Sequence, residues 1–196
     1  LYLRKEDKDK LLSMLQTYEK RDQIFEELGI PKKLGILAHG LPGTGKTTTI
    51  LAIADHLGLD VYYLNLNGIK LNSQLKELFD YIIKENIMGG LIVFEDIDAM
   101  TDIVLKRTET TDSSSDASGG EASGGEANGG EASGATGIKD IDDKLSLSYL
   151  LNLLDGTLCM ENTMFIITTN FKNKLDPALY RKGRIDVDIE FTGFLF

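Results

Sequence analysis

The ten residues from Gly40 to Thr49, "GLPGTGKTTT", have the types and spacing of a loop that binds phosphate groups. Gly40 is followed by four residues and then by Gly45-Lys46-Thr47, which matches the phosphate-loop pattern at each fixed position. The apolar run "LGILA" comes before this segment, and the helix-like "ILAIADHLGL" comes after it. A plain glycine-rich bend is the alternative, but a bend has no need of Gly-Lys-Thr at this spacing.

The loop also predicts how phosphate groups would be held. Backbone N–H groups from Gly40 to Gly45 can point at phosphate oxygens, and the helix that follows adds its N-terminal dipole. We expect Lys46 to contact the terminal phosphates, the Thr47 hydroxyl to bind Mg²⁺, and Thr48 to donate to an inner phosphate. The predicted binding residues are Gly40, Leu41, Pro42, Gly43, Thr44, Gly45, Lys46, Thr47 and Thr48.

A cluster of acids follows the third apolar run, "LIVFEDID". Glu95, Asp96 and Asp98 come directly after four apolar residues, where a buried strand would end. A phosphate loop needs a carboxylate at the end of a neighbouring strand to hold its metal ion. An acidic strand end that only faces water is the alternative. The phosphate loop upstream favours the metal site, with Thr47 and Glu95 as its protein ligands.

Two further polar features lie near the end of the chain. Thr168-Thr169-Asn170 ends a fourth apolar run, which would place an amide at the edge where ligands of open α/β sheets bind. The segment "LDPALYRKGRID" contains Arg181 and Arg184. Surface arginines in solvent are one interpretation. The other is that they reach the γ-phosphate of a neighbouring subunit, where an arginine finger accelerates hydrolysis by about 10³–10⁵.

The elements that would position these residues alternate between strands and helices. The predicted strands are 34–38, 60–67, 89–98, 162–170 and 186–191, and the predicted helices are 6–29, 46–57, 72–86 and 145–156. Alternation of this kind is typical of a parallel sheet covered by helices on both faces. We therefore predict an α/β fold of the P-loop NTPase type, with a five-stranded parallel sheet between helices.

Composition limits the classes of protein. The 196 residues suit one domain, 42% of them are hydrophobic, and no apolar run has transmembrane length. The first residue is Leu1 and no signal peptide is visible, so we expect a piece of a longer protein. The single cysteine, Cys159, excludes a disulfide scaffold and a cysteine-ligated zinc site.

The net charge of −10 is unevenly distributed, because one tract differs from the rest of the chain. Residues 108–137 contain six acids and no Lys or Arg, and they repeat the pentad SGGEA without a large apolar residue. We expect this tract to be a flexible insertion within a domain that spans 1–196. The remainder of the chain has 25 acids against 21 bases. It therefore lacks the excess of basic residues that is typical of a nucleic-acid binder.

The motifs "GLPGTGKTT", "FEDID", "TTN" and "LDPALYRKGRID", in this order, resemble those of the AAA family of ring-forming ATPases. The resemblance covers 29–191. Within the family the chain is most similar to the group formed by the mitochondrial inner-membrane AAA chaperone that translocates the Rieske iron–sulfur protein and its plant and viral relatives. That group shares the Glu-Asp order of "FEDID", where most AAA proteins have Asp-Glu, and some members carry an insertion at the same place.

The resemblance implies a role for each polar residue. Glu95 takes the metal-side role, Asp96 polarises the attacking water, and Asn170 is the sensor. Arg181 and Arg184 are the fingers that act in trans. It also implies the fold of the AAA large subdomain, and because the chain ends just past the fifth strand we expect its C-terminal helical lid to be absent.

The function that follows is Mg²⁺-dependent ATP hydrolysis coupled to the remodelling or translocation of a protein substrate. The intact protein would form a homo-oligomeric ring of about six or seven subunits. Any membrane anchor would lie outside this chain. The expected location of the intact protein is the mitochondrial inner membrane or the cytoplasm. The alternatives are a nucleotide-responsive assembly scaffold with little turnover, a DNA-directed clamp loader and a P-loop kinase. No aromatic-hydrophobic-glycine pore motif follows the second strand, where "LNLNGIKLN" stands instead.

Overall fold

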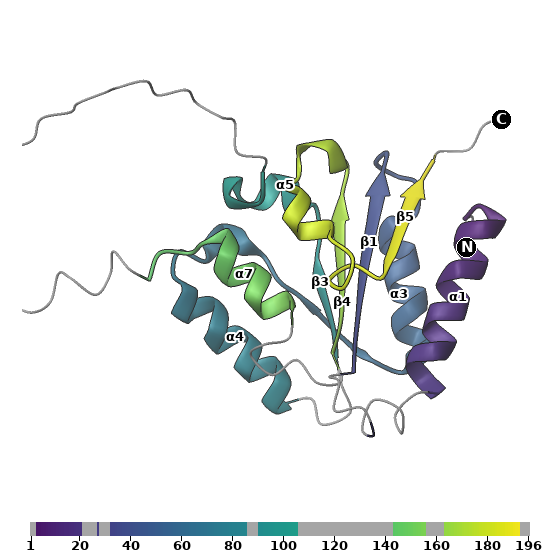
Figure 1. Cartoon of the computed structure of the whole chain (residues 1–196), viewed down its shortest axis with the longest axis horizontal. Coiled ribbons are helices and arrows are strands. Elements are labelled where there is room, and N and C mark those ends of the chain that lie inside the picture. Colours follow the sequence, from purple (N-terminus) through teal and green to yellow (C-terminus); the bar gives the residue numbers. More distant parts are fainter. Residues whose placement is uncertain are drawn as a thin grey trace, which may run out of the picture.

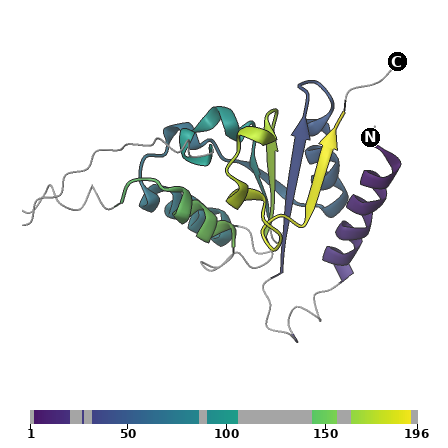
Figure 2. The same ribbon diagram turned by 45° about the horizontal axis from the view of Figure 1, so that its top comes forward.

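Five parallel strands form the centre of the structure, a computed structural model that describes residues 3–20, 27, 32–85, 90–105, 143–155 and 163–192. The strands are β1 (Lys33–Gly40), β2 (Asp60–Tyr63), β3 (Gly90–Phe94), β4 (Thr163–Thr169) and β5 (Val187–Phe191). They are ordered β2-β3-β4-β1-β5, and each neighbouring pair is parallel. The arrowheads accordingly share one end of the sheet (Figure 2). The predicted five-stranded parallel sheet is confirmed.

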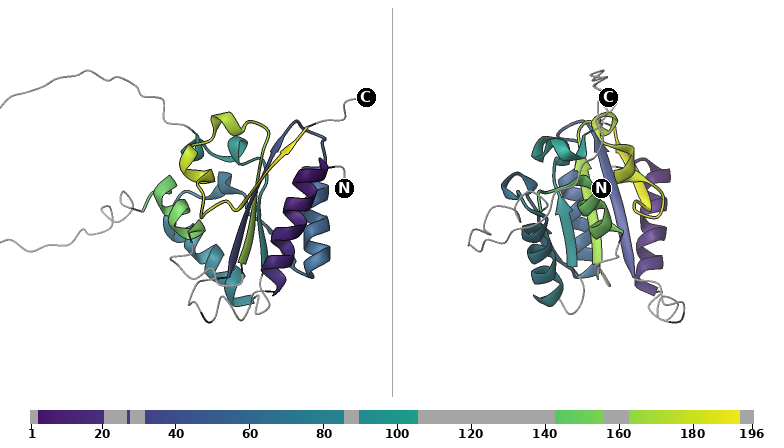
Figure 3. Two further views of the ribbon diagram at one scale, coloured as in Figure 1. Left: turned by 45° about the vertical axis from the view of Figure 1, so that its right-hand side comes forward. Right: turned by 60° about the vertical axis from the view of Figure 1, so that its left-hand side comes forward.

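Helices cover both faces of this sheet (Figure 1). The longer ones are α1 (Lys5–Lys20), α3 (Lys46–Leu57), α4 (Asn72–Glu85) and α7 (Leu147–Leu154). Seen nearly edge-on, the sheet has α1 and α3 on one side and α4 and α7 on the other (Figure 3, left). None of the helices in the described ranges is long and apolar enough to cross a membrane.

Short helical turns connect several of the strands to the elements that follow them. They are η1 (Leu66–Gly68), α5 (Ile97–Met100), η2 (Asp102–Val104), η3 (Lys172–Lys174) and η4 (Pro177–Tyr180). The turns α5 and η3 follow the carboxyl ends of β3 and β4, the edge that the sequence predicts for polar side chains. They therefore fix how the chain leaves that edge.

The strands alternate between two apolar cores, one under each helical layer. On β1, Ile36 packs in the core with α1 and α3, and Leu37 packs in the core with α4 and α7. Ile166 and Ile167 divide in the same way on β4. Burying an aliphatic side chain of this size contributes about 1.5–3 kcal/mol. The continuous apolar runs in the sequence thus reflect a sheet buried on both faces.

Some predicted boundaries need correction. The second strand ends at Tyr63 and not at Asn67, because the Asn65 side chain accepts a hydrogen bond from the Asn67 N–H and starts η1. The third strand ends at Phe94 and not at Asp98, because Asp96 adopts a left-handed backbone (φ 47) and starts α5.

The helical predictions are close to the observed bounds. Helix α3 covers the predicted residues, and α7 starts only after Ser146, whose hydroxyl accepts from the Tyr149 N–H. The first helix is described as far as Lys20, so its predicted second half, apart from the helical Glu27, lies outside the described residues. The same holds for the predicted insertion at 108–137.

Candidate functional site

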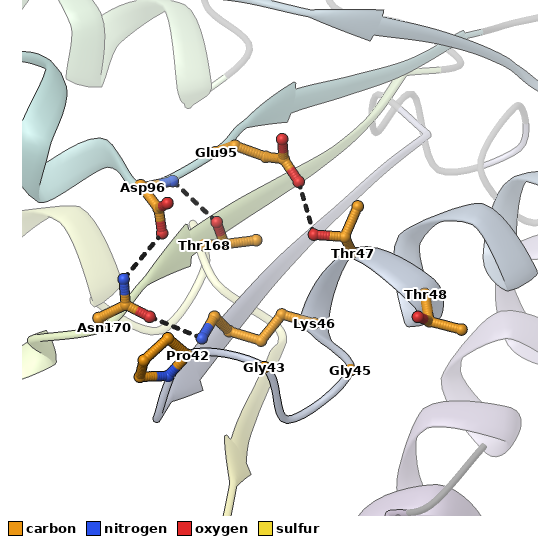
Figure 4. A pocket seen from close by; sticks show the side chains of 10 residues that line it. All are labelled: Pro42, Gly43, Gly45, Lys46, Thr47, Thr48, Glu95, Asp96, Thr168 and Asn170. Carbon is orange, nitrogen blue, oxygen red and sulfur yellow. Dashed lines mark hydrogen bonds between the residues drawn. The ribbon is translucent and has the colours of Figure 1, made fainter.

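The phosphate-type loop joins β1 to α3 at the carboxyl edge of the sheet (Figure 4). Gly45 has φ 97, a left-handed backbone that suits glycine, and from it the chain turns directly into the helix. No side chain caps the N-terminus of α3, and its first turn contains no acid. The free N–H groups and positive dipole end of this 12-residue helix therefore face the loop.

Lys46 is held rigidly inside this loop. Its side chain is largely buried, with the residue 8% exposed, and its Nζ donates to the carbonyls of Gly40 (2.8 Å) and Leu41 (2.9 Å). The third ammonium proton goes to Asn170 Oδ1 (2.7 Å). Burial lowers the pKa of Lys46, and the charges of Asp96 and Asp98 oppose that effect. The result is a fixed ammonium at the mouth of the loop.

Thr47 and Glu95 form a pair of oxygen donors beside this lysine. The Thr47 Oγ1 donates to Glu95 Oε1 over 2.8 Å, which joins the first turn of α3 to the end of β3 (Figure 4). A hydroxyl and a carboxylate are ligands that Mg²⁺ accepts, and Mg²⁺ normally completes its shell with water and substrate phosphates. Within the described ranges no group of three or more His, Cys, Asp or Glu side chains is placed to hold a metal ion. The pair therefore suits a metal ion that arrives with a phosphate ligand.

Asp96 is held in an unusual backbone conformation by the neighbouring strand. With φ 47 it is the one residue other than glycine with positive φ among the described residues. Such a conformation costs on the order of 1–3 kcal/mol and persists where the surroundings impose it. Here the Asp96 N–H donates to Thr168 Oγ1 on β4 over 2.9 Å. The backbone strain thus lies at the carboxylate that the sequence assigns to water activation.

Asn170 connects the lysine to this carboxylate. Its Oδ1 accepts from Lys46 Nζ, and its Nδ2 donates to Asp96 Oδ1 over 3.1 Å. The amide thereby lies between the two charged groups and forms a hydrogen bond with each of them (Figure 4). An amide can do this because it carries a donor and an acceptor on one rigid group.

These side chains surround a cavity of about 360 Å³. Its lining is Pro42, Gly43, Gly45, Lys46, Thr47, Thr48, Glu95, Asp96, Thr168 and Asn170. Three of the predicted binding residues are not part of that lining. Gly40 and Leu41 instead offer their carbonyls to Lys46, and the Thr44 hydroxyl turns back to the Leu41 carbonyl (2.6 Å).

The two arginines lie elsewhere. Arg181 and Arg184 line a second cavity, of about 370 Å³, together with Lys33 at the start of β1. Lys33 stands seven residues before Gly40, so about 23 Å of extended strand separates it from the loop. Within one chain the arginines therefore do not join Lys46. Arg181 is exposed, whereas Arg184 is buried and binds Asp155 of its own chain.

Comparison with known proteins agrees with this geometry. The family model described as "ATPase family associated with various cellular activities (AAA)" matches residues 36–119 and 132–192. The chain belongs to the AAA family. The AAA match spans β1 to β5 and includes the phosphate loop, the acids after β3, Asn170 and both arginines. It leaves 120–131 unmatched, within the predicted insertion.

Several curated relatives carry AAA-ATPase names. The chain is 39% identical over 189 residues to "AAA-ATPase At3g28510", 37% over 194 residues to "AAA-ATPase At3g28580" and 34% over 187 residues to "AAA-ATPase At3g28600", all from Arabidopsis thaliana. These alignments cover 95%, 98% and 94% of this chain but 34%, 37% and 35% of the relatives. The chain thus spans about a third of the length of the relatives it matches. It is an AAA ATPase domain.

Two contacts of this AAA domain involve residues whose roles the motifs do not reveal. Thr168 and Thr169 precede Asn170 in sequence, but the sequence does not say what they bind. The Thr168 hydroxyl accepts from Asp96, and the Thr169 hydroxyl donates to Asp98 Oδ1 over 2.6 Å. Asp98 therefore supports the end of β4 and does not line the cavity. Alternation along β4 is the one signal that could have assigned the two threonines to different partners.

A charged cluster lies behind the AAA phosphate loop. Asp188 on β5 forms an ion pair with Lys172, and the Nε2 of His39 lies 3.1 Å from Asp188 Oδ1. That Oδ1 is buried and has no well-aligned hydrogen bond, so the His39 contact is an ion pair only when the imidazole is protonated. His39 directly precedes Gly40, and Lys172 follows Asn170 by two residues. The cluster connects the turn after Asn170 to the strand that carries the loop.

Proposed function

We propose that the whole protein hydrolyses ATP with Mg²⁺ at the cavity around Lys46. The observation that carries this proposal is the continuous chain of contacts Lys46–Asn170–Asp96, which lies beside the Thr47–Glu95 pair. Such an arrangement puts a cation, a sensor amide and a carboxylate around one cavity, as phosphoryl transfer to water requires. Membership of the AAA family supports the same chemistry.

Each residue has a separable task in this proposal. The N–H groups at the start of α3 and the Lys46 ammonium hold the phosphates, and Thr47 with Glu95 would hold Mg²⁺. When bound, Mg²⁺ neutralises charge that develops on the phosphate oxygens. Asp96 accepts a hydrogen bond from the attacking water and draws its proton away. Asn170 forms hydrogen bonds with both that carboxylate and the lysine and so fixes their relative positions.

The site is completed by a second copy of the chain. Because the arginines lie about 23 Å along β1 from the loop, they are candidates for the neighbour's nucleotide and not for their own. A head-to-tail interface that repeats this relation forms a ring when its rotation closes. We propose that Arg181, which is exposed, is presented to the adjacent subunit in that ring.

Hydrolysis would drive the remodelling or translocation of a protein substrate. The resemblance to the AAA chaperone of the Rieske iron–sulfur protein supports this part, and the similarity to plant AAA-ATPases supports the hydrolysis that would drive it. The turn after β2 has Leu66 buried and Asn65 and Asn67 exposed, and it carries no aromatic side chain. We propose that the protein moves its substrate without an aromatic side chain in this turn that contacts an unfolded polypeptide.

The test is ATP turnover by the assembled, full-length protein. Lys46→Ala should abolish turnover and ATP binding, because it removes the fixed ammonium, while circular dichroism stays that of the wild type. The matched control is Lys70→Ala, since Lys70 is a lysine outside both cavities that hold the proposed chemistry. Wild-type turnover in Lys46→Ala would refute the proposal. Tight ATP binding with negligible turnover in the wild type would favour the assembly scaffold instead.

A further inference from the structure

Arg181 and Arg184, three residues apart, have opposite environments. Arg181 is exposed, whereas only 8% of Arg184 is exposed. A finger that enters a neighbouring site must be able to leave its own chain. The two arginines therefore meet that requirement to different degrees, although the sequence offers them as equals.

Arg184 uses its whole guanidinium within its own chain. Its Nε donates to Asp155 Oδ1 over 2.8 Å, and its Nη2 donates to Asp155 Oδ2, which makes a two-pronged pair. Its Nη1 donates to the carbonyl of Ala178 in η4. Fork-on-fork pairs of this kind fix both position and orientation. To reach a neighbour, Arg184 would have to break all three contacts and leave the Asp155 carboxylate without its arginine partner.

Asp155 is itself fixed by the end of a helix. It caps α7, and its N–H donates to the Leu151 carbonyl over 2.9 Å. The Lys33 Nζ donates to the Asp155 carbonyl over 2.7 Å and thus satisfies an unpaired acceptor of the helix end. Positive charge is also favourable at this end of the helix dipole. Arg184 is therefore attached to a rigid point on α7.

The same turn that buries Arg184 exposes Arg181. The Arg181 carbonyl accepts from the N–H groups of both Arg184 (3.1 Å) and Ile185 (3.0 Å). Gly183, with φ 90, lets the chain close this turn. Immediately afterwards the Asp186 N–H donates to the Gly35 carbonyl on β1 (2.9 Å). The turn 181–185 is thus bound to α7 on one side and to β1 on the other.

We propose that Arg181 alone enters the neighbouring nucleotide site, and that Arg184 is a positioning residue that holds the turn through Asp155. The proposal rests on the proposed trans arrangement, and it assigns the two arginines different tasks within it. Arg184 acts on turnover only through the place it gives to Arg181. Asp155, which no motif singles out, shares that task.

The experiment measures kcat and KM for ATP in assembled full-length rings that carry Arg181→Ala, Arg184→Lys, Asp155→Asn or the Arg184→Lys/Asp155→Asn pair. Arg181→Ala should lower kcat by about 10³–10⁵-fold. Arg184→Lys and Asp155→Asn should each lower it by about 10–100-fold, the effect of a small misplacement, with KM nearly unchanged. The double variant should be no slower than the slower single variant, because both changes break one contact. Lys182→Ala, in the same turn, is the matched control and should keep wild-type kcat.

Two results would overturn the assignment. One is Arg184→Lys as slow as Arg181→Ala together with Asp155→Asn at the wild-type rate, since Arg184 would then touch the nucleotide itself. The other is a double variant whose loss equals the product of the two single losses. Wild-type turnover in Arg181→Ala would instead refute the trans finger of the proposed function, so the two failures are distinguishable.

A second variant covers the case in which these changes prevent assembly. Gly183→Ala leaves every charge in place, and its added Cβ would meet nothing within 4 Å, but alanine strongly disfavours φ 90. It should therefore disturb only the turn and lower kcat about 10–100-fold without changing KM. Wild-type kcat in Gly183→Ala would count against the proposal.

Discussion

The backbone N–H of Asp96 donates to the side-chain hydroxyl of Thr168 over 2.9 Å, across the neighbouring strands β3 and β4. This bond helps to hold a residue whose φ of 47 is uncommon for residues other than glycine, although Asp tolerates it better than most. Without it, only the contacts of Asp96 with Asn170 and with the Ala99 N–H would oppose a shift of this backbone, and we expect the carboxylate to move relative to Asn170. The orientation of the proposed water-activating group therefore depends on a threonine that lies one strand away.

We predict that Thr168→Val lowers kcat about 10–100-fold, because a shift of about 1 Å in a positioned group has an effect of this size. The affinity for ATP should change little, since Lys46 and the loop are untouched. Thr168→Ser, which restores the hydroxyl, should recover most of the rate. Steady-state turnover and equilibrium nucleotide binding test this together. Equal rates for the Val and Ser variants would show that the hydroxyl is not needed.

The two acids after β3 should fail in different ways. Asp96→Asn should slow hydrolysis by about 10²–10⁴-fold and spare ATP binding, because it removes the group that draws a proton from water. Glu95→Gln should instead raise the Mg²⁺ concentration needed for half-maximal turnover, because Glu95 pairs with the Thr47 hydroxyl. Turnover measured across a Mg²⁺ titration separates the two effects. If the metal response belonged to Asp96→Asn and not to Glu95→Gln, the roles would be exchanged.

Much of this domain follows from the sequence because local patterns decide it. The apolar runs predict strands buried on both faces, and Gly45-Lys46-Thr47 predicts the turn into α3. The order of the motifs also predicts which strands end at the site, since parallel strands share one carboxyl edge. These features depend on residues that are close in sequence or on rules that hold for every parallel sheet.

Other features depend on contacts between distant residues, and for that reason the sequence does not reveal them. Asp155 and Arg184 are separated by 29 positions, and nothing in either segment indicates that they pair. Asp98 looks like a third metal-site acid, yet it binds Thr169 at the end of β4. The second strand is predicted to extend to Asn67, because alternating Leu and Asn have the period of a strand. In the structure the Asn65 side chain instead caps the turn η1, and the strand has already ended.

The charged cluster behind the loop predicts a specific acid response. Burial alone would raise the pKa of Asp188, but its contacts with His39 and Lys172 outweigh burial and lower it. A carboxyl whose pKa is lowered by folding stabilises the fold above its unfolded pKa of about 3.9. That stabilisation is lost as pH falls through the lower, folded value. The cost of Asp188→Asn in unfolding free energy should thus be present at pH 7 and shrink below about pH 4.

Urea unfolding of wild type and Asp188→Asn at several pH values measures this difference. Lys172→Met is the useful background, because Lys172 supplies part of the lowering. In that background the cost of Asp188→Asn should depend less on pH. A cost that stays constant from pH 7 to pH 3 would mean that Asp188 does not contribute through its charge.

Mixed rings test whether the finger acts between subunits. A ring of Lys46→Ala subunits has no intact site, and a ring of Arg181→Ala subunits has no intact finger, so each should be nearly inactive. In a ring formed from equal amounts of both, about a quarter of the head-to-tail interfaces join an intact site to an intact finger. We predict that turnover returns at those interfaces to a corresponding fraction of the wild-type rate.

The control is a mixture of wild type with Lys46→Ala, which shows whether Lys46→Ala subunits enter rings and still present Arg181. Suppose that this control keeps the activity of its wild-type sites while the mixture of Lys46→Ala and Arg181→Ala subunits stays inactive. Arg181 must then act on the site of its own chain or only on the fold. The distance along β1 opposes the first of these, because about 23 Å of strand separates the arginine cavity from the loop. Regained activity would therefore establish that the catalytic unit is an interface, with Lys46 from one subunit and Arg181 from the next.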